Sequence, residues 1–131
     1  LFRSLVPTVG ANVALENIVN KTAPENLILK LFISNTTPSN TDTAGTYTEA
    51  TFPGYVAITL TGTSWGAASA RSIAYAQQTF TCTGVATDNV YGYYLVGATS
   101  GILKWAERDA SAPFAVRVSG DAVKITPTIT A

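Results

Sequence analysis

Two carboxylates and a tryptophan are the arrangement in this sequence that is nearest to a catalytic site. Glu107 and Asp109 follow Trp105 at intervals of two residues, so in an unbroken strand the three side chains share one face. Acids spaced in this way lie about 7 Å apart, which is a separation typical of inverting glycosidases. However, Lys104 and Arg108 flank the two acids. We therefore favour surface ion pairs at the end of a strand over a catalytic pair.

The sequence lacks most other groups that carry out catalysis or bind metals. It contains no histidine and a single cysteine, Cys82, which excludes histidine-dependent nucleophiles, paired-cysteine zinc sites and internal disulfide bonds. Asp42 and Glu49 could contribute to a calcium site, but their spacing does not match the regular acidic pattern of known calcium loops. Cys82 lies in an alternating run and is interpreted as a small buried hydrophobic residue. We predict no catalytic residue, no metal site and no cofactor.

The composition predicts a weakly charged surface. Hydrophobic residues make up 47% of the 131 residues and charged residues 12%, and eight basic residues balance eight acidic ones. A nucleic-acid-binding protein needs a basic surface to neutralise phosphates, so we predict no nucleic-acid partner. No apolar run approaches the roughly 18 residues that cross a bilayer, so we predict no membrane partner. Such a surface is covered either by threonine and other polar side chains or by a neighbouring subunit.

The elements that must position these residues are mainly strands. Residues 89–108 predict two strands joined by a turn, with Leu103 and Trp105 on one face of the second strand. Residues 26–34 are almost continuously apolar and predict a central strand buried on both faces. Short apolar segments and turn signals continue to the end of the chain. Together they predict an all-β, single-domain β-sandwich or Greek-key, jelly-roll-like fold of seven or eight strands over residues 11–131.

An apolar segment and one short helix precede these strands. Residues 1–10 are interrupted by Pro7 and predict an extended N-terminal arm. Residues 11–21 predict a helix of two or three turns that covers one edge or end of the sheets. Three apolar residues at helical spacing would make that contact: Leu15, Ile18 and Val19. The arm residues would either fold back onto their own core or reach a neighbouring subunit.

A long polar loop, residues 35–51, is the best candidate for specificity, because long connections in compact domains are commonly functional. Its aromatic residue, Tyr47, would either contact a partner or hold the loop against the core. The predicted interface residues come from the arm and from this loop: Phe2, Leu5, Val6, Thr37, Pro38 and Tyr47. An alternative binding surface would consist of exposed aromatic side chains that stack on a ligand: Tyr91, Tyr93, Tyr94 and Trp105. We expect most of these four side chains to lie in the core instead.

Several segments, taken together, resemble a group of small proteins encoded among bacteriophage structural genes. The segments that carry this resemblance are Leu27–Phe32 with Asn35, Thr37 and Pro38, Tyr47–Ala50 with Gly54–Ala57, Tyr75–Phe80, Val90–Tyr94, Leu103–Arg108, and Ile125–Pro127. They cover nearly the whole chain after the arm, and none of them is a catalytic signature.

The resemblance implies a structural component of a virion, assembled in the cytoplasm of a bacterial host. Our leading hypothesis is a non-enzymatic capsid decoration (cement) protein that binds the head and whose partner is the major capsid protein. Proteins of this kind often act as trimers, so a homo-oligomer is expected, with a trimer favoured. The alternative is a tail or head-tail component, or a receptor- or glycan-binding module.

Overall fold

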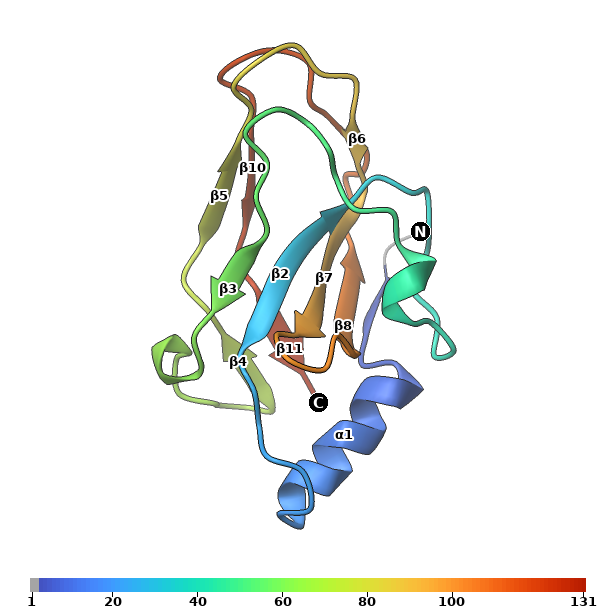
Figure 1. The fold of residues 1–131 in the computed structure, drawn as a ribbon, viewed down its shortest axis with the longest axis vertical. Helices are drawn as coiled ribbons and strands as arrows, with labels where there is room; N and C mark the ends of the chain where they lie inside the picture. Colours follow the sequence, from blue (N-terminus) through green and yellow to red (C-terminus); the bar gives the residue numbers. More distant parts are fainter. Residues whose placement is uncertain (1–2) are drawn as a thin grey trace.

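The described residues are mostly β-structure, in antiparallel pairs, with one α-helix, as predicted (Figure 1). A computed structural model describes residues 3–131. The strands are β1 (Arg3–Leu5), β2 (Leu27–Phe32), β3 (Ile58–Leu60), β4 (Ser72–Ala74), β5 (Gln78–Thr81), β6 (Asn89–Val90), β7 (Gly92–Gly97), β8 (Leu103–Arg108), β9 (Phe114–Ala115), β10 (Ala122–Ile125) and β11 (Thr128–Thr130). They are shorter and more numerous than predicted, because several apolar stretches are divided between two sheets.

The largest sheet has the strand order β1-β8-β7-β2-β3, and all of its neighbours are antiparallel. β7 and β8 form the hairpin predicted for residues 89–108. Gly101, in the turn between them, has a φ of 68°, a left-handed conformation that glycine adopts without steric cost. β2 lies between β7 and β3, so the apolar stretch 26–34 forms the predicted central strand.

A β-bulge in β8 changes which residues share a face. Leu95 of β7 pairs with Trp105, and Val96 pairs with Leu103, so Lys104 is the extra residue between them. A bulge interrupts the regular alternation of side chains. Consequently Trp105 packs in one hydrophobic cluster and Leu103 in another. The prediction that these two side chains share a face is wrong.

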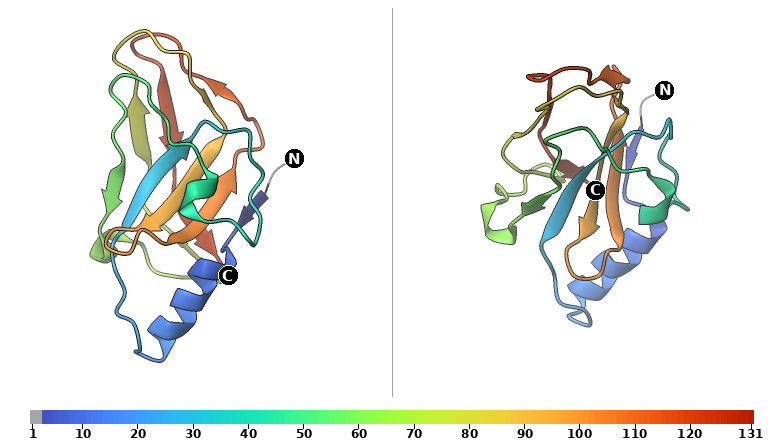
Figure 2. Two further views of the ribbon diagram at one scale, coloured as in Figure 1. Left: turned by 45° about the vertical axis from the view of Figure 1, so that its right-hand side comes forward. Right: turned by 45° about the horizontal axis from the view of Figure 1, so that its top comes forward.

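The main hydrophobic core lies between this sheet and strands of the small ladders beside it (Figure 2). The ladders are β10–β5, β11–β4 and β6–β9, and each is antiparallel. Val123 and Ile125 of β10 alternate inward with period two and meet Phe80 of β5. Cys82 is also buried in this cluster, as predicted.

The other face of the large sheet is covered by the long loop. Tyr47 stacks on Tyr94 of β7, with 5.1 Å between the ring centroids. Its hydroxyl donates a hydrogen bond of 2.7 Å to Oδ2 of the buried Asp42. Tyr47 therefore holds the loop against the sheet, which is one of the two roles considered for it. A short 3₁₀ turn, η1 (Ala44–Thr46), immediately precedes Tyr47.

Helix α1 (Thr8–Ile18) starts three residues earlier than predicted and ends three residues earlier. Pro7 occupies its N-cap position, and the Pro7 carbonyl accepts a hydrogen bond from the Ala11 amide. The buried residue of the helix is Gly10, which packs on β8. The three residues predicted to cover the sheets are instead exposed: Leu15, Ile18 and Val19. That prediction is wrong, because the small residue Gly10 allows the opposite face of the helix to approach the sheet.

The described part of residues 1–10 is not a separate arm. β1 is an edge strand of the large sheet, where Ser4 pairs with Glu107 and Leu5 with Ala106. Thr8 and the two residues after it already belong to α1. Residues 3–10 therefore fold onto their own chain, because β8 offers β1 an unpaired edge. Phe2 lies outside the described residues.

Candidate binding groove

A groove of about 510 Å³ lies between α1 and the adjacent end of the β-structure. Its walls are mainly apolar, and its charged side chains are Glu25 and Lys104. The apolar residues come from α1, from the segments on either side of it, from the loop that carries Trp65 and from the three strands β2, β4 and β11. The side chains that define the groove are Val13, Ala14, Leu27, Trp65, Ile73 and Ile129.

The N-terminal end of α1 touches β8 directly at Gly10. A Cβ atom at this position would lie 2.7 Å from the carbonyl oxygen of Leu103 and 2.9 Å from Cα of Lys104. Both are backbone atoms, which cannot move aside as a flexible side chain can. The absence of a side chain therefore fixes the start of the helix against the sheet.

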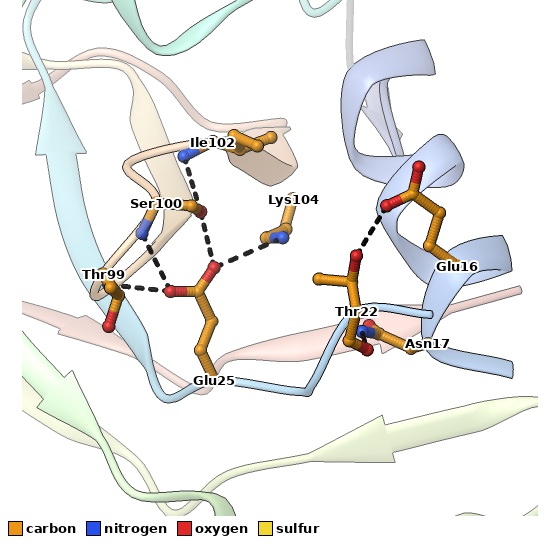
Figure 3. Close-up of polar contacts among 8 residues, drawn as sticks. All are labelled: Glu16, Asn17, Thr22, Glu25, Thr99, Ser100, Ile102 and Lys104. Carbon is orange, nitrogen blue, oxygen red and sulfur yellow. Dashed lines mark hydrogen bonds and ion pairs between the residues drawn. The ribbon is translucent and has the colours of Figure 1, made fainter. Parts of the chain in front are cut away.

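The C-terminal end of α1 is held by the segment that returns the chain to β2. The Thr22 hydroxyl donates a 2.7 Å hydrogen bond to Oε2 of Glu16, and the Asn17 amide donates a 2.6 Å bond to the Thr22 carbonyl (Figure 3). Glu16 also forms an exposed ion pair with Lys21 at 3.4 Å. These contacts support the last turn of the helix from one side and leave its inner face open to the groove.

Glu25 joins this returning segment to the β7–β8 turn. Its Oε2 atom accepts hydrogen bonds from the amides of Thr99, at 2.7 Å, and of Ser100, at 3.0 Å, and its Oε1 atom accepts one from the Ser100 hydroxyl (Figure 3). Gly97 leaves room for the carboxylate, because a Cβ atom there would overlap Oε1. Partial burial alone would raise the pKa of Glu25. The hydrogen bonds from Ser100 and Thr99, with the nearby Lys104, outweigh this effect and lower the pKa from 4.5 to about 2.

Lys104 is the bulged residue of β8, and the bulge directs its side chain to the groove wall. Its Nζ atom lies 3.6 Å from Oε1 of Glu25, and its side chain is 13% exposed. Charge-assisted hydrogen bonds are about 2.7–2.9 Å long, so this pair interacts mainly through charge. Glu25 is the ion-pair partner of Lys104 among the side chains of residues 5–131. The ammonium group carries three donors, so it can donate to a further acceptor at the groove wall besides its contact with Glu25.

The predicted interface residues lie at different places. Val6 lines the groove, and Leu5 is half-buried in β1. Pro38 and Tyr47 are buried in their own chain, so their side chains leave little area for a partner. Thr37 is exposed. The structure does not bring these residues together into one surface, and the partner contact predicted for them stays a prediction.

The aromatic residues of the central hairpin are mostly core, as expected. Tyr93, Tyr94 and Trp105 are each buried. Tyr91 is half-buried, and the guanidinium of Arg108 lies 5.0 Å from its ring centroid. These rings do not form an exposed platform for stacking on a sugar.

Glu107 and Asp109 line a polar pocket of only about 100 Å³. Burial raises the pKa of Glu107 from its ordinary value. Among the side chains of residues 5–131 neither acid forms an ion pair, whereas Lys104 pairs with Glu25. The predicted surface ion pairs at the strand end are therefore wrong, because the bulge turns Lys104 towards the groove. Residues 3–131 also contain no cluster of three acidic, histidine or cysteine side chains that could hold a metal ion.

The groove depends on residues that the sequence does not single out. Glu25 and the 99–100 turn are more than 70 residues apart in the sequence, and no local pattern indicates that they meet. In the sequence, Lys104 looks like an ordinary strand residue that alternates with Leu103 and Trp105. The bulge is visible only in the pairing register of β7 and β8. The apolar spacing of α1 does identify the helix, but it gives no sign that the small residue Gly10 makes the buried contact.

Comparisons with known proteins do not identify a family. No model of a known protein family matches the chain. Searches of curated proteins and of solved structures also give no significant match. None of the described helices is both long enough and apolar enough to cross a bilayer.

Proposed function

We propose that this protein is a non-enzymatic structural component of a bacteriophage virion, most specifically a capsid decoration protein of the head. The observation that carries the proposal is the outer face of α1. Leu15, Ile18 and Val19 are 63%, 79% and 72% exposed and lie at helical spacing, so they form one apolar surface. Contiguous apolar surface of this kind marks protein contact sites.

The charge distribution supports the same function. The chain has a net charge of zero, and the charged neighbours of the helix face, Glu16 and Lys21, pair with each other. A partner therefore meets an apolar surface with no net charge, which is suited to burial against another protein. The resemblance of segments throughout the chain to small phage structural proteins supports a virion as the place of that contact.

The proposed partner is the major capsid protein, and the proposed assembly is a homo-oligomer, with a trimer favoured. The antiparallel sheets and the core between them support a β-sandwich of the Greek-key or jelly-roll kind as the rigid body that presents α1. Many copies attached to one shell can each contribute a weak contact, and the linked contacts together stabilise the shell.

The proposal is tested by replacing two residues of the helix face in the phage genome. Leu15→Ser with Ile18→Ser removes exposed apolar area whose burial is worth about 1.5–3 kcal/mol per side chain. We expect the number of copies bound to purified capsids to fall by about tenfold or more. The melting temperature of the free protein should stay the same, because both side chains are exposed in it.

The matched control is Val85→Ser. Val85 is 85% exposed, and its loop, between β5 and β6, lies at the end of the molecule opposite α1 (Figure 1). This change should leave capsid occupancy unaltered. Equal loss from both variants, or no loss from the double variant, contradicts attachment through the outer face of α1.

A further inference from the structure

We propose that the groove beneath α1 binds a single-chain amphiphile, with the aliphatic body in the groove and an anionic head on Lys104. This site is on the opposite face of α1 from the surface proposed to contact the capsid. The inference concerns a small ligand and therefore goes beyond the proposed structural role.

The walls of the groove suit an aliphatic body. Its volume of about 510 Å³ lies within the range of small-molecule sites, about 300–1,000 Å³. Val13 and Ala14 form one wall, and Leu27, Ile73 and Ile129 contribute to the others. These side chains offer branched and small apolar groups without hydrogen-bonding atoms, and burial of a ligand chain against them is favourable in proportion to the area removed from water.

Contacts at both ends of α1 hold the helix in place beside the groove. Gly10 presses the start of α1 onto the backbone of β8, and the bonds among Glu16, Asn17 and Thr22 secure its end (Figure 3). Between these two supports the inner face of the helix stands away from the β-structure. The space is therefore present before a ligand arrives, which reduces the conformational cost of binding.

The head group is specified by Lys104. Its ammonium group is 3.6 Å from Glu25, and Glu25 already accepts three donors from the 99–100 turn. The donors of Lys104 thus have room for a second acceptor on the side of the groove. Two other lining side chains carry N–H donors: the Asn17 amide, which donates to Thr22, and the Trp65 indole.

An anionic head complements this arrangement better than the alternatives do. A carboxylate would form charge-assisted hydrogen bonds with Lys104, which are about twice as strong as neutral ones. A hydroxyl head would lack the charge, and an ammonium head would be repelled. The Glu25 carboxylate also lines the groove, but its oxygens already accept three hydrogen bonds from the 99–100 turn.

The test uses three probes with the same ten-carbon tail and different heads: decanoate, 1-decanol and decylammonium. Isothermal titration of the purified full chain at submillimolar probe should show one decanoate bound per chain. We expect 1-decanol to bind about tenfold more weakly, because it lacks a charge-assisted hydrogen bond, and decylammonium to bind more weakly still.

Two pairs of variants separate the tail from the head. Ala14→Phe fills the groove and should abolish decanoate binding, whereas Leu15→Phe, the same new side chain on the outer face, should leave it unchanged. Lys104→Met should weaken decanoate binding by about tenfold while leaving 1-decanol binding unaltered, and Lys104→Arg should restore decanoate binding. A purely structural role for Lys104 would affect both probes alike.

Several results would overturn the proposal. Equal affinity for the three heads, many probe molecules per chain, or full binding to Ala14→Phe would each do so. If decanoate does not bind and Ala14→Phe releases the protein from capsids, the groove is part of the capsid contact. Failure of decanoate binding with capsid attachment intact in Ala14→Phe removes the ligand proposal and leaves the proposed function standing.

Discussion

Glu25 is the side chain that connects most of the parts of the groove. It comes from the segment after α1, accepts hydrogen bonds from the β7–β8 turn and lies beside Lys104 of β8. A carboxylate with this many donors is stabilised in its charged form. The residue therefore couples the position of the helix to that of the hairpin, and its protonation should weaken the coupling.

This coupling predicts a specific pH dependence of stability. The pKa of Glu25 is lowered from 4.5 to about 2 on folding, so its contribution is complete above pH 4.5 and is lost as the pH falls towards 2. At pH 7 we expect Glu25→Gln to lower the free energy of unfolding by about 1–2 kcal/mol, less than the full pKa shift would give, because solvent screens the carboxylate. The difference from the natural protein should shrink as the pH falls from 5 to 2, measured by urea unfolding.

Glu107→Gln provides a control, because its effect on stability should depend on pH in the opposite direction to that of Glu25→Gln. Burial raises the pKa of Glu107, so its protonated form favours the folded state below the unfolded pKa, and this contribution is lost as the pH rises. The stability of Glu107→Gln relative to the natural protein should therefore increase with pH. Parallel pH profiles for the natural protein and Glu25→Gln would show that Glu25 is not stabilised in its charged form.

Among the secondary-structure elements, α1 is predicted from the sequence pattern, but its buried face is not. Its apolar spacing predicts a helix near residues 11–21, and a helix is present. The pattern does not say which face is buried, because glycine has no hydrophobic side chain to mark that face. Gly10 stabilises the packing of the helix by allowing its backbone to lie close to β8. Leu15, Ile18 and Val19 consequently face outward, where they form the surface on which the proposed function depends.

Gly10→Ala tests this packing. The new Cβ atom would collide with backbone atoms of Leu103 and Lys104, and strain of this kind in a packed contact typically costs about 1–3 kcal/mol. Alanine favours a helix by about 1 kcal/mol over glycine, which only partly offsets the cost. We expect a net loss of stability in urea unfolding and displacement of α1 from β8.

The matched control for this change is Gly45→Ala in η1. Its new Cβ atom would meet only the Thr43 hydroxyl, at 3.8 Å, which is an ordinary contact. The stability of this variant should be close to that of the natural protein. Similar losses in both variants would show that the close approach at Gly10 is not what holds the helix.

For the whole molecule, sequence periodicity predicts the antiparallel β-structure, the central hairpin and the buried central strand correctly. Local patterns cannot give the pairing of distant strands, so the edge position of β1 and the bulge at Lys104 emerge only from the three-dimensional register. The same limit applies to the groove, because its lining comes from segments as far apart as Val6 and Ile129. Residue types alone predict an apolar chain with little charge, but not where its exposed apolar surface lies.

A decoration protein should be abundant in the virion. Quantitative mass spectrometry of purified virions from the source of this sequence would give its copy number per particle. Because a decoration protein repeats with the symmetry of the shell, we expect on the order of hundreds of copies, comparable to the major capsid protein. A dozen copies or fewer would place the protein in the tail or its adaptor, and its absence from virions would contradict the proposed function altogether.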